Sequence, residues 1–345
     1  MLTSRTETIL RSIVGQYIAR ATPVSSQSII NDHELGVSTA TIRNEMAHLE
    51  REGYITRPHP SAGSIPSDKG YRYYVGTLID IRLPLAEQRL INHLFHQVER
   101  ELEEWLNLAA TLVAQLAQNV AVVTMPKPIS CRFKHLELVA LHDSLVLLVL
   151  VLRGAKAKQQ LITFTQIIPQ SELRAISDRL NAIYSGLTRS QILPKSTGLS
   201  PSEQQVTDCL LGVMKAEDKQ EYEEPYLDGL HFILNQPEFI HSHRMLSLME
   251  LVEHRDLLRS IVPSELVRQG VQVVIGKENR AEAIQDYSVV ISQYGLPQEA
   301  VGTIGVVGPT RMPYARAIST VDYLSSVLSR LVAELYGREA PDNAN

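Results

Sequence analysis

Cysteine is nearly absent from this chain of 345 residues, which contains only Cys131 and Cys209. Two isolated thiols in a chain of this length exclude a disulfide framework and are typical of a reducing compartment. Neither thiol belongs to a CxxC pair or lies near a histidine cluster. We therefore predict that both are buried as core thiols.

Long apolar runs are also missing. The longest, from Ser144 to Leu152, is about a third of the length that a transmembrane helix needs. Residues 1–10 lack the basic and then apolar pattern of a signal peptide. These absences predict a soluble, cytoplasmic protein without membrane contact.

A strong charge of either sign is lacking too, because the formal net charge is −5 and 44% of the residues are apolar. This composition is typical of a globular chain, and its length predicts two or three folded units. Residues 1–82 carry nine Lys or Arg and eight Asp or Glu, whereas the rest of the chain carries 24 and 30. The front end is thus slightly basic, as a local nucleic-acid-binding face would be.

The first 82 residues have the element order of a winged helix-turn-helix. The evidence is the spacing of apolar residues by three and four, together with serines that suit helix N-caps. The expected elements are a helix at 3–20, a short helix after Ser25 or Ser26, a turn around Gly36, a helix at 39–52 capped by Ser38, a polar hairpin at 59–64 and a helix from Ser67-Asp68 onward.

The helix at 39–52 is the element expected to read DNA. Its inward face is predicted to be apolar, with Ile42, Met46 and Leu49. Its outward face then carries small, polar and basic residues, namely Thr39, Ala40, Arg43, Asn44 and Ala47. Arginine can bind guanine, asparagine can pair with adenine, and methyl groups can contact thymine. On composition alone, Arg43 and Asn44 are equally compatible with solvated surface positions.

The helix N-terminus and the hairpin offer further candidate contacts. Backbone N–H groups beside Ser38 and Thr39 attract phosphate. Arg57 and His59 lie near the hairpin tip, where Gly63 allows close approach to a backbone. The predicted DNA-binding residues are Ser38, Thr39, Ala40, Thr41, Arg43, Asn44, Arg57, His59, Ser61 and Gly63.

The remaining chain predicts a mixed α+β protein. A heptad pattern from Ile91 to Leu116 predicts one long helix at 86–118, whose apolar seam packs either within the chain or against a symmetry-related copy. The other expected elements are strands at 120–124, 136–141, 145–152, 160–164, 271–275, 288–293 and 303–307, with a hairpin turn at His142–Ser144, and helices at 170–185, 201–217, 244–261 and 314–336.

Signals for other chemistry are weak. The histidines between 241 and 254 have no Cys or carboxylate set to complete a metal site, and no nucleophile elbow is present. Gly302, Gly305 and Gly308 are spaced unlike a phosphate-binding loop, so we predict turn and packing roles. For Pro309–Met312 a structural role is favoured over an anion site. We predict neither enzyme activity nor a cofactor.

Eight short segments at the two ends of the chain carry a family resemblance. They are 23–26, 38–46, 49–50, 53–55, 58–59, 61–63, 70–75 and 305–314. Together they resemble HrcA, the family of bacterial heat-inducible transcription repressors. The region at about 155–240 matches weakly by motif.

The resemblance implies a winged helix-turn-helix at 1–82, a discontinuous GAF-like α/β domain at 83–155 and 240–340, and an inserted α+β dimerisation domain at 156–239. It further implies a homodimer that binds an inverted-repeat operator, CIRCE, and represses heat-shock chaperone operons of the groE and dnaK type. Release on heat stress and support by the GroE chaperonin are also implied. A metabolite-responsive regulator, with the GAF-like domain as ligand sensor, remains the alternative.

One departure from the family pattern lies in the wing. After Ser-Ala-Gly the family usually has arginine and, three residues later, threonine, whereas this chain has Ser64 and Ser67. The missing arginine removes a possible contact with phosphate or the minor groove. We therefore expect the third helix to contribute more to recognition than the wing.

Overall fold

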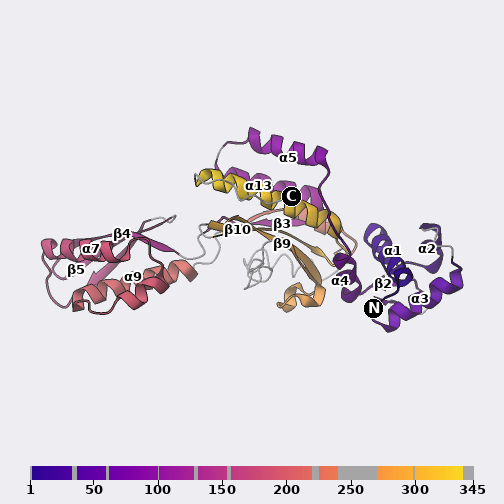
Figure 1. Ribbon diagram of the computed structural model, residues 1–345, viewed down its shortest axis with the longest axis horizontal. Coiled ribbons are helices and arrows are strands. Elements are labelled where there is room, and N and C mark those ends of the chain that lie inside the picture. The colour runs from indigo at the N-terminus through magenta and orange to yellow at the C-terminus, as the bar shows by residue number, and fades with distance from the viewer. Residues whose placement is uncertain are drawn as a thin grey trace. The chain divides into compact units, whose positions relative to one another are not determined.

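The computed structural model describes residues 2–32, 37–59, 62–99, 101–127, 131–153, 157–219, 225–239, 270–297 and 300–336. In these ranges the protein is mixed α+β, as predicted, with sheets of two, five and three strands (Figure 1). It divides into two compact units: residues 1–126, 222–296 and 302–345, and residues 127–221 and 297–301. None of the described helices is long and apolar enough to cross a membrane.

Residues up to Gly76, which we call the head, have the element order predicted for a winged helix-turn-helix: three helices, a two-stranded hairpin and a fourth helix. β1 and β2 pair antiparallel, and Val24 extends this wing through two backbone hydrogen bonds with Ser64. Ile9 and Ile13 lie fully buried in its core. The elements are α1 (Ser4–Arg20), α2 (Ser26–Asp32), α3 (Thr39–Arg51), β1 (Ile55–Thr56), β2 (Ile65–Pro66) and α4 (Asp68–Gly76).

A five-stranded sheet with a hydrophobic core on each face forms the rest of the first unit, which we call the central domain. Its strand order is β7-β3-β10-β9-β8. All four residues of β3 are buried because alternate side chains enter opposite cores, one of them lined by α6 and α13. The elements are α5 (Leu85–Gln97), α6 (Leu102–Ala117), β3 (Val120–Val123), β7 (Tyr226–Asp228), α10 (Leu230–Leu234), β8 (Gln272–Ile275), η2 (Gly276–Glu278), η3 (Glu282–Ile284), β9 (Tyr287–Leu296), β10 (Ala300–Pro309) and α13 (Tyr314–Leu335).

The prediction of one long helix at 86–118 is wrong, because the chain leaves the helical conformation between α5 and α6. Val98 and Glu101 both have extended backbone angles there. An unbroken helix would run for about 50 Å, whereas α13 spans only about 33 Å. The break lets both helices pack near α13: α6 contacts it directly, and Asn92 of α5 donates to the Tyr323 hydroxyl. The heptad seam is therefore buried within the chain.

The three glycines near the C-terminus have the predicted packing role. All of them lie on β10, in the middle of the sheet. A Cβ at Gly305 would be 2.8 Å from the carbonyl oxygen of Val290 on the neighbouring strand. A Cβ at Gly302 would overlap the ring of Tyr294. These positions allow close strand packing and form no loop.

The second unit is a three-stranded antiparallel sheet, β4-β5-β6, packed on helices. Its hairpin turns at the predicted place, with Asp143 in the left-handed region. From the sequence, residues 83–155 were predicted to belong to the GAF-like domain. β4 and β5 instead pack here, because Leu136 and Leu148 share one core with α7 and α9. The elements are β4 (Arg132–His142), β5 (Leu145–Arg153), β6 (Lys158–Thr163), α7 (Gln170–Tyr184), α8 (Arg189–Ile192), η1 (Leu193–Lys195) and α9 (Pro201–Lys219).

The two thiols differ in their surroundings. Cys131 is buried in the core of the second unit, as predicted, whereas Cys209 is only partly buried at the edge of that core. Several predicted features lie outside the described residues: the turn around Gly36, the helix at 244–261, the histidines between 241 and 254, and Ser61.

Candidate nucleic-acid interface

The sequence of α3 explains why this helix presents a fixed face to solvent. Ile42 and Leu49 are fully buried and Met46 nearly so, as predicted. Ser38 caps the helix, because its hydroxyl oxygen accepts a hydrogen bond from the backbone N–H of Thr41 at 3.2 Å. Gly53 ends the helix with φ +77°, a conformation that residues with a Cβ rarely adopt. The inward face and both ends of the helix are therefore held by the rest of the head.

The opposite face of α3 carries the predicted recognition residues. Ala40, Arg43 and Asn44 are exposed and Thr39 is half-exposed. Thr41 lies at the flank, and its hydroxyl is 3.0 Å from that of Ser38. The guanidinium of Arg43 reaches back to α2, with Nε 3.4 Å from the Ser26 hydroxyl. This long, exposed hydrogen bond leaves the arginine free to exchange partners.

A carboxylate that sequence reasoning missed ties α3 to α1. The Thr6 hydroxyl donates to Oε2 of Glu45 at 2.8 Å, and Thr6 is itself buried. Glu45 lies next to Asn44 on the helix, so this bond helps to set the rotation of the reading face. The two residues are 39 positions apart, and no local spacing in the sequence joins them.

Of the wing candidates, Arg57 lies beside α3. Arg57 Nε lies 3.2 Å from Oε2 of Glu50, which is on α3. His59 is exposed, and Ser61 lies outside the described residues. Gly63 is needed by the head itself, because a Cβ there would be 2.6 Å from the carbonyl of Val24.

Ser64, where the family usually has arginine, lies inside the head. Ser64 is fully buried and its backbone pairs with Val24. Its hydroxyl has no hydrogen-bond partner among the described residues. The side chain is therefore enclosed in the head and is not available for a contact with DNA. Ser67 keeps the capping role of a threonine, because it accepts from the N–H of Gly70 and donates to the carbonyl of Gly53.

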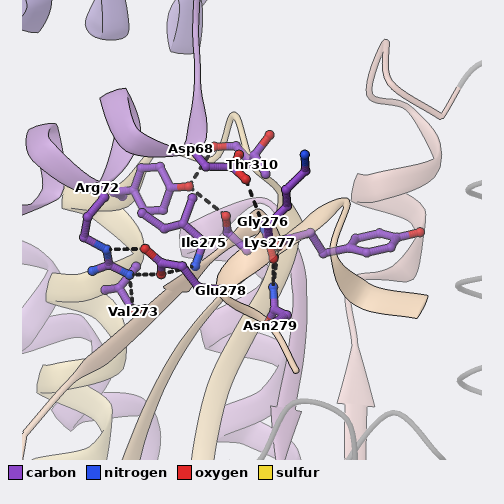
Figure 2. A network of polar contacts seen from close by, with 12 residues as sticks. Asp68, Arg72, Val273, Ile275, Gly276, Lys277, Glu278, Asn279 and Thr310 are labelled. Atoms are coloured by element: carbon purple, nitrogen blue, oxygen red, sulfur yellow. Dashed lines mark hydrogen bonds and ion pairs between the residues drawn. The ribbon is translucent and has the colours of Figure 1, made fainter. Parts of the chain in front are cut away.

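Two contacts from α4 join the head to the central domain (Figure 2). The guanidinium of Arg72 binds both carboxylate oxygens of Glu278 and donates to the carbonyl of Val273 at 2.6 Å. Asp68 accepts a hydrogen bond from the backbone N–H of Lys277 at 3.0 Å. Burial alone would raise the pKa of Glu278, but hydrogen bonds and the charge of Arg72 lower it. The carboxylate is thereby kept ionised and bound.

A third contact uses the predicted structural segment Pro309–Met312. Arg311 Nη1 donates to the carbonyl of Ile18 in α1 at 2.7 Å, and its Nε donates to Glu238 at 2.5 Å. The rings of Tyr71 and Tyr314 meet nearby, with centroids 5.8 Å apart. Burial raises the pKa of the Tyr71 hydroxyl, so it stays neutral. The guanidinium of Arg311 is bound internally, as the structural role predicts.

Known proteins resemble this chain along almost its full length. A family model described as HrcA protein C terminal domain matches residues 103–318. A heat-inducible transcription repressor HrcA of Dehalococcoides mccartyi is 57% identical over 342 residues, and the match covers 99% of this chain and 99% of the relative. The repressor of the same name from Roseiflexus castenholzii is 41% identical, with 98% of this chain and 96% of the relative covered.

A solved structure also resembles the chain. It is described as a hypothetical protein and has a TM-score of 0.63 at 23% identity, with 97% of this chain and 99% of that chain covered. At this identity the likeness establishes a shared fold alone. These relatives are named as transcription repressors, not as enzymes. By both sequence measures, the chain belongs to the HrcA family of heat-inducible transcription repressors.

Proposed function

We propose that the protein is a cytoplasmic, homodimeric repressor that binds an inverted-repeat operator of the CIRCE type through α3. The observation that carries the proposal is the exposed face of α3, where Ala40, Arg43 and Asn44 project from a helix whose other face is buried. These residue types suit base edges in a major groove. At the helix N-terminus, beside Ser38 and Thr39, backbone N–H groups would donate hydrogen bonds to a DNA phosphate.

The mechanism is occupancy of the promoter. A dimer places two copies of α3 in major grooves about 34 Å apart, or a multiple of that distance, so its operator is palindromic. Bound protein then blocks polymerase from the chaperone operon. Arg57 and His59 of the wing add contacts that depend little on sequence, because phosphate lies along every site.

The second unit is the proposed dimerisation domain. Its sheet has an apolar outer row in which Val139, Leu147 and Leu161 lie side by side on β4, β5 and β6. Val139 is 42% exposed and Leu161 is 52% exposed, and Leu141 extends the row. Contact with the same face of a second copy would remove these apolar side chains from water, which is favourable.

Sedimentation tests this assignment. Val139→Glu with Leu161→Glu should convert the dimer to a monomer, because the charges would be buried without partners in the interface. Arg174→Glu on α7, outside this sheet face, is the matched control and should leave the dimer intact. A dimer that survives the double substitution would place the interface elsewhere.

The domain with the five-stranded sheet is the proposed GAF-like domain. Heat and chaperonin are the proposed regulators of the repressor. Footprinting upstream of the organism's own chaperonin operon should reveal a protected inverted repeat. Occupancy should fall on heating and recover with chaperonin, because a stability change of ~1–2 kcal/mol alters the active fraction several-fold. Occupancy that responds to a metabolite and to neither heat nor chaperonin would support the ligand-sensing alternative instead.

A further inference from the structure

We propose that Arg72 and Asp68 act as positioning residues that set the operator spacing, because they clamp the head to the central domain in one orientation. The inference rests on the proposed homodimer and its inverted-repeat operator. Both residues lie on α4, outside the proposed DNA-reading face on α3 and the wing. We call the contacts of Asp68 and Arg72 with residues 273–278 the head clamp.

The arginine half of the head clamp accepts only one geometry. Nε and Nη2 of Arg72 bind the two carboxylate oxygens of Glu278, and Nη2 also reaches the carbonyl of Val273. Glu278 is held in turn by the N–H of Ile275 at 2.9 Å. A planar guanidinium that binds a carboxylate through two bonds fixes direction as well as distance. The end of β8 is therefore joined rigidly to α4.

The aspartate half lies one helical turn earlier. Asp68 binds the N–H of Lys277, and its carboxylate packs against Gly276 so closely that a Cβ there would overlap it. Gly276 has φ +51°, which also disfavours a side chain. Because Asp68 and Arg72 are four residues apart, they lie on the same face of α4. Two bonds one turn apart fix the direction of the helix axis (Figure 2).

A third anchor uses another helix of the head. Arg311 binds the carbonyl of Ile18 near the end of α1, and Tyr71 packs on Tyr314. The anchors therefore lie on two helices, α1 and α4, and tilting the head as a rigid body would strain at least one of them. The head is therefore held at one angle relative to the central domain.

A fixed head angle has a consequence for the operator. Each added base pair moves the second half-site by about 3.4 Å and turns it by about a tenth of a helical turn. A head clamped to the central domain can follow this movement less freely than a released head. The clamp would thus determine which spacer length is bound tightly, although it contributes no contact to the bases.

The test compares spacer lengths rather than overall affinity. The probes are duplexes that carry the footprinted inverted repeat with its natural spacer, with spacers changed by about two and about five base pairs, and a single half-site. Arg72→Ala and Asp68→Asn should each reduce the preference for the natural spacer by about 10-fold, as expected for loss of a charged hydrogen bond. Affinity for the single half-site should remain that of the wild type. Arg89→Ala, an exposed arginine on α5, is the matched control.

The outcomes separate this inference from the proposed function. Wild-type preference for the natural spacer that persists in both clamp variants would overturn the clamp. A wild type that binds no inverted repeat would overturn the proposed function. Glu278→Gln keeps the shape of the carboxylate and removes its charge, so it answers the same question if Arg72→Ala does not fold. Loss of half-site affinity in all clamp variants would also overturn the proposal, because it would show that these residues maintain the fold of the head rather than its orientation.

Discussion

Arg57 of the wing and Glu50 of the recognition helix form an ion pair, with Nε 3.2 Å from Oε2. Both side chains are about one-third exposed, so water screens the pair and its contribution to stability is small. Its position matters more, because the carboxylate lies beside the one arginine that we place on the wing. DNA phosphate and Glu50 would compete for the same guanidinium.

Glu50→Gln should therefore increase affinity for DNA of any sequence, because it removes a competing charge and releases Arg57.

Arg57→Ala should weaken binding to all sequences alike and reduce the slope of log K against log salt by about 0.9, the value for one phosphate contact. Filter binding over a series of salt concentrations measures both effects. An unchanged slope in Arg57→Ala would place this arginine away from phosphate.

Arg43→Ala should cost ~1–3 kcal/mol in specific binding and relax the base preference at one position of each half-site. Its partner in the free protein is the Ser26 hydroxyl, at 3.4 Å, which is too weak a bond to hold it back. Competition binding with single-base operator variants reads out the effect. Normal operator binding by Arg43→Ala would show that α3 presents a different face.

Thr6→Val should destabilise the head by about 1 kcal/mol, because Glu45 would lose a hydrogen bond from a buried hydroxyl. Thr8→Val is the matched control on the same helix, since among the described residues the Thr8 hydroxyl bonds only to the carbonyl of Ser4 in its own helix. Thermal unfolding compares the two variants. We also expect Thr6→Val to bind its operator less tightly, and equal behaviour of both variants would refute an anchoring role for Glu45.

Acid should weaken the head clamp. The pKa of Glu278 is lowered from its ordinary value of 4.5, since burial is outweighed by hydrogen bonds from Arg72 and the N–H of Ile275 and by the charge of Arg72. A lowered pKa in the folded state contributes stability above the unfolded value, and this contribution disappears as pH falls through the folded value. The difference in unfolding free energy between wild type and Glu278→Gln should be constant near neutral pH and shrink below 4.5. A difference that does not change with pH would show that the clamp carboxylate is not linked to folding.

The local features of the head follow from its sequence. Ser38 is a strong N-cap, Gly53 suits a left-handed helix end, and the spacing of Ile42, Met46 and Leu49 assigns the buried face of α3. Each of these signals acts within a few residues, so neighbouring positions were enough to predict it. The same holds for Gly305, since its spacing from Gly302 and Gly308 is unlike that of a phosphate-binding loop and predicted a turn or packing role.

Predictions failed where a distant partner decides the structure. A continuous heptad pattern covers 86–118, yet the helix breaks because both of its halves must pack near α13. Position 64 was predicted to belong to a polar hairpin tip at 59–64, although pairing with Val24 buries it. In both cases the local pattern was correct and the competing tertiary contact was stronger.

By itself the sequence determined the helix-turn-helix order, the face of α3 that carries Arg43 and Asn44, and the family resemblance. Those properties depend on residue order and on helical periodicity. Only the tertiary structure decided that Glu45 bonds to Thr6, that Glu50 pairs with Arg57, and that Arg72 meets Glu278 across 206 positions. Such contacts depend on how separate elements pack, and burial of a shared core, rather than any local rule, brings those side chains together.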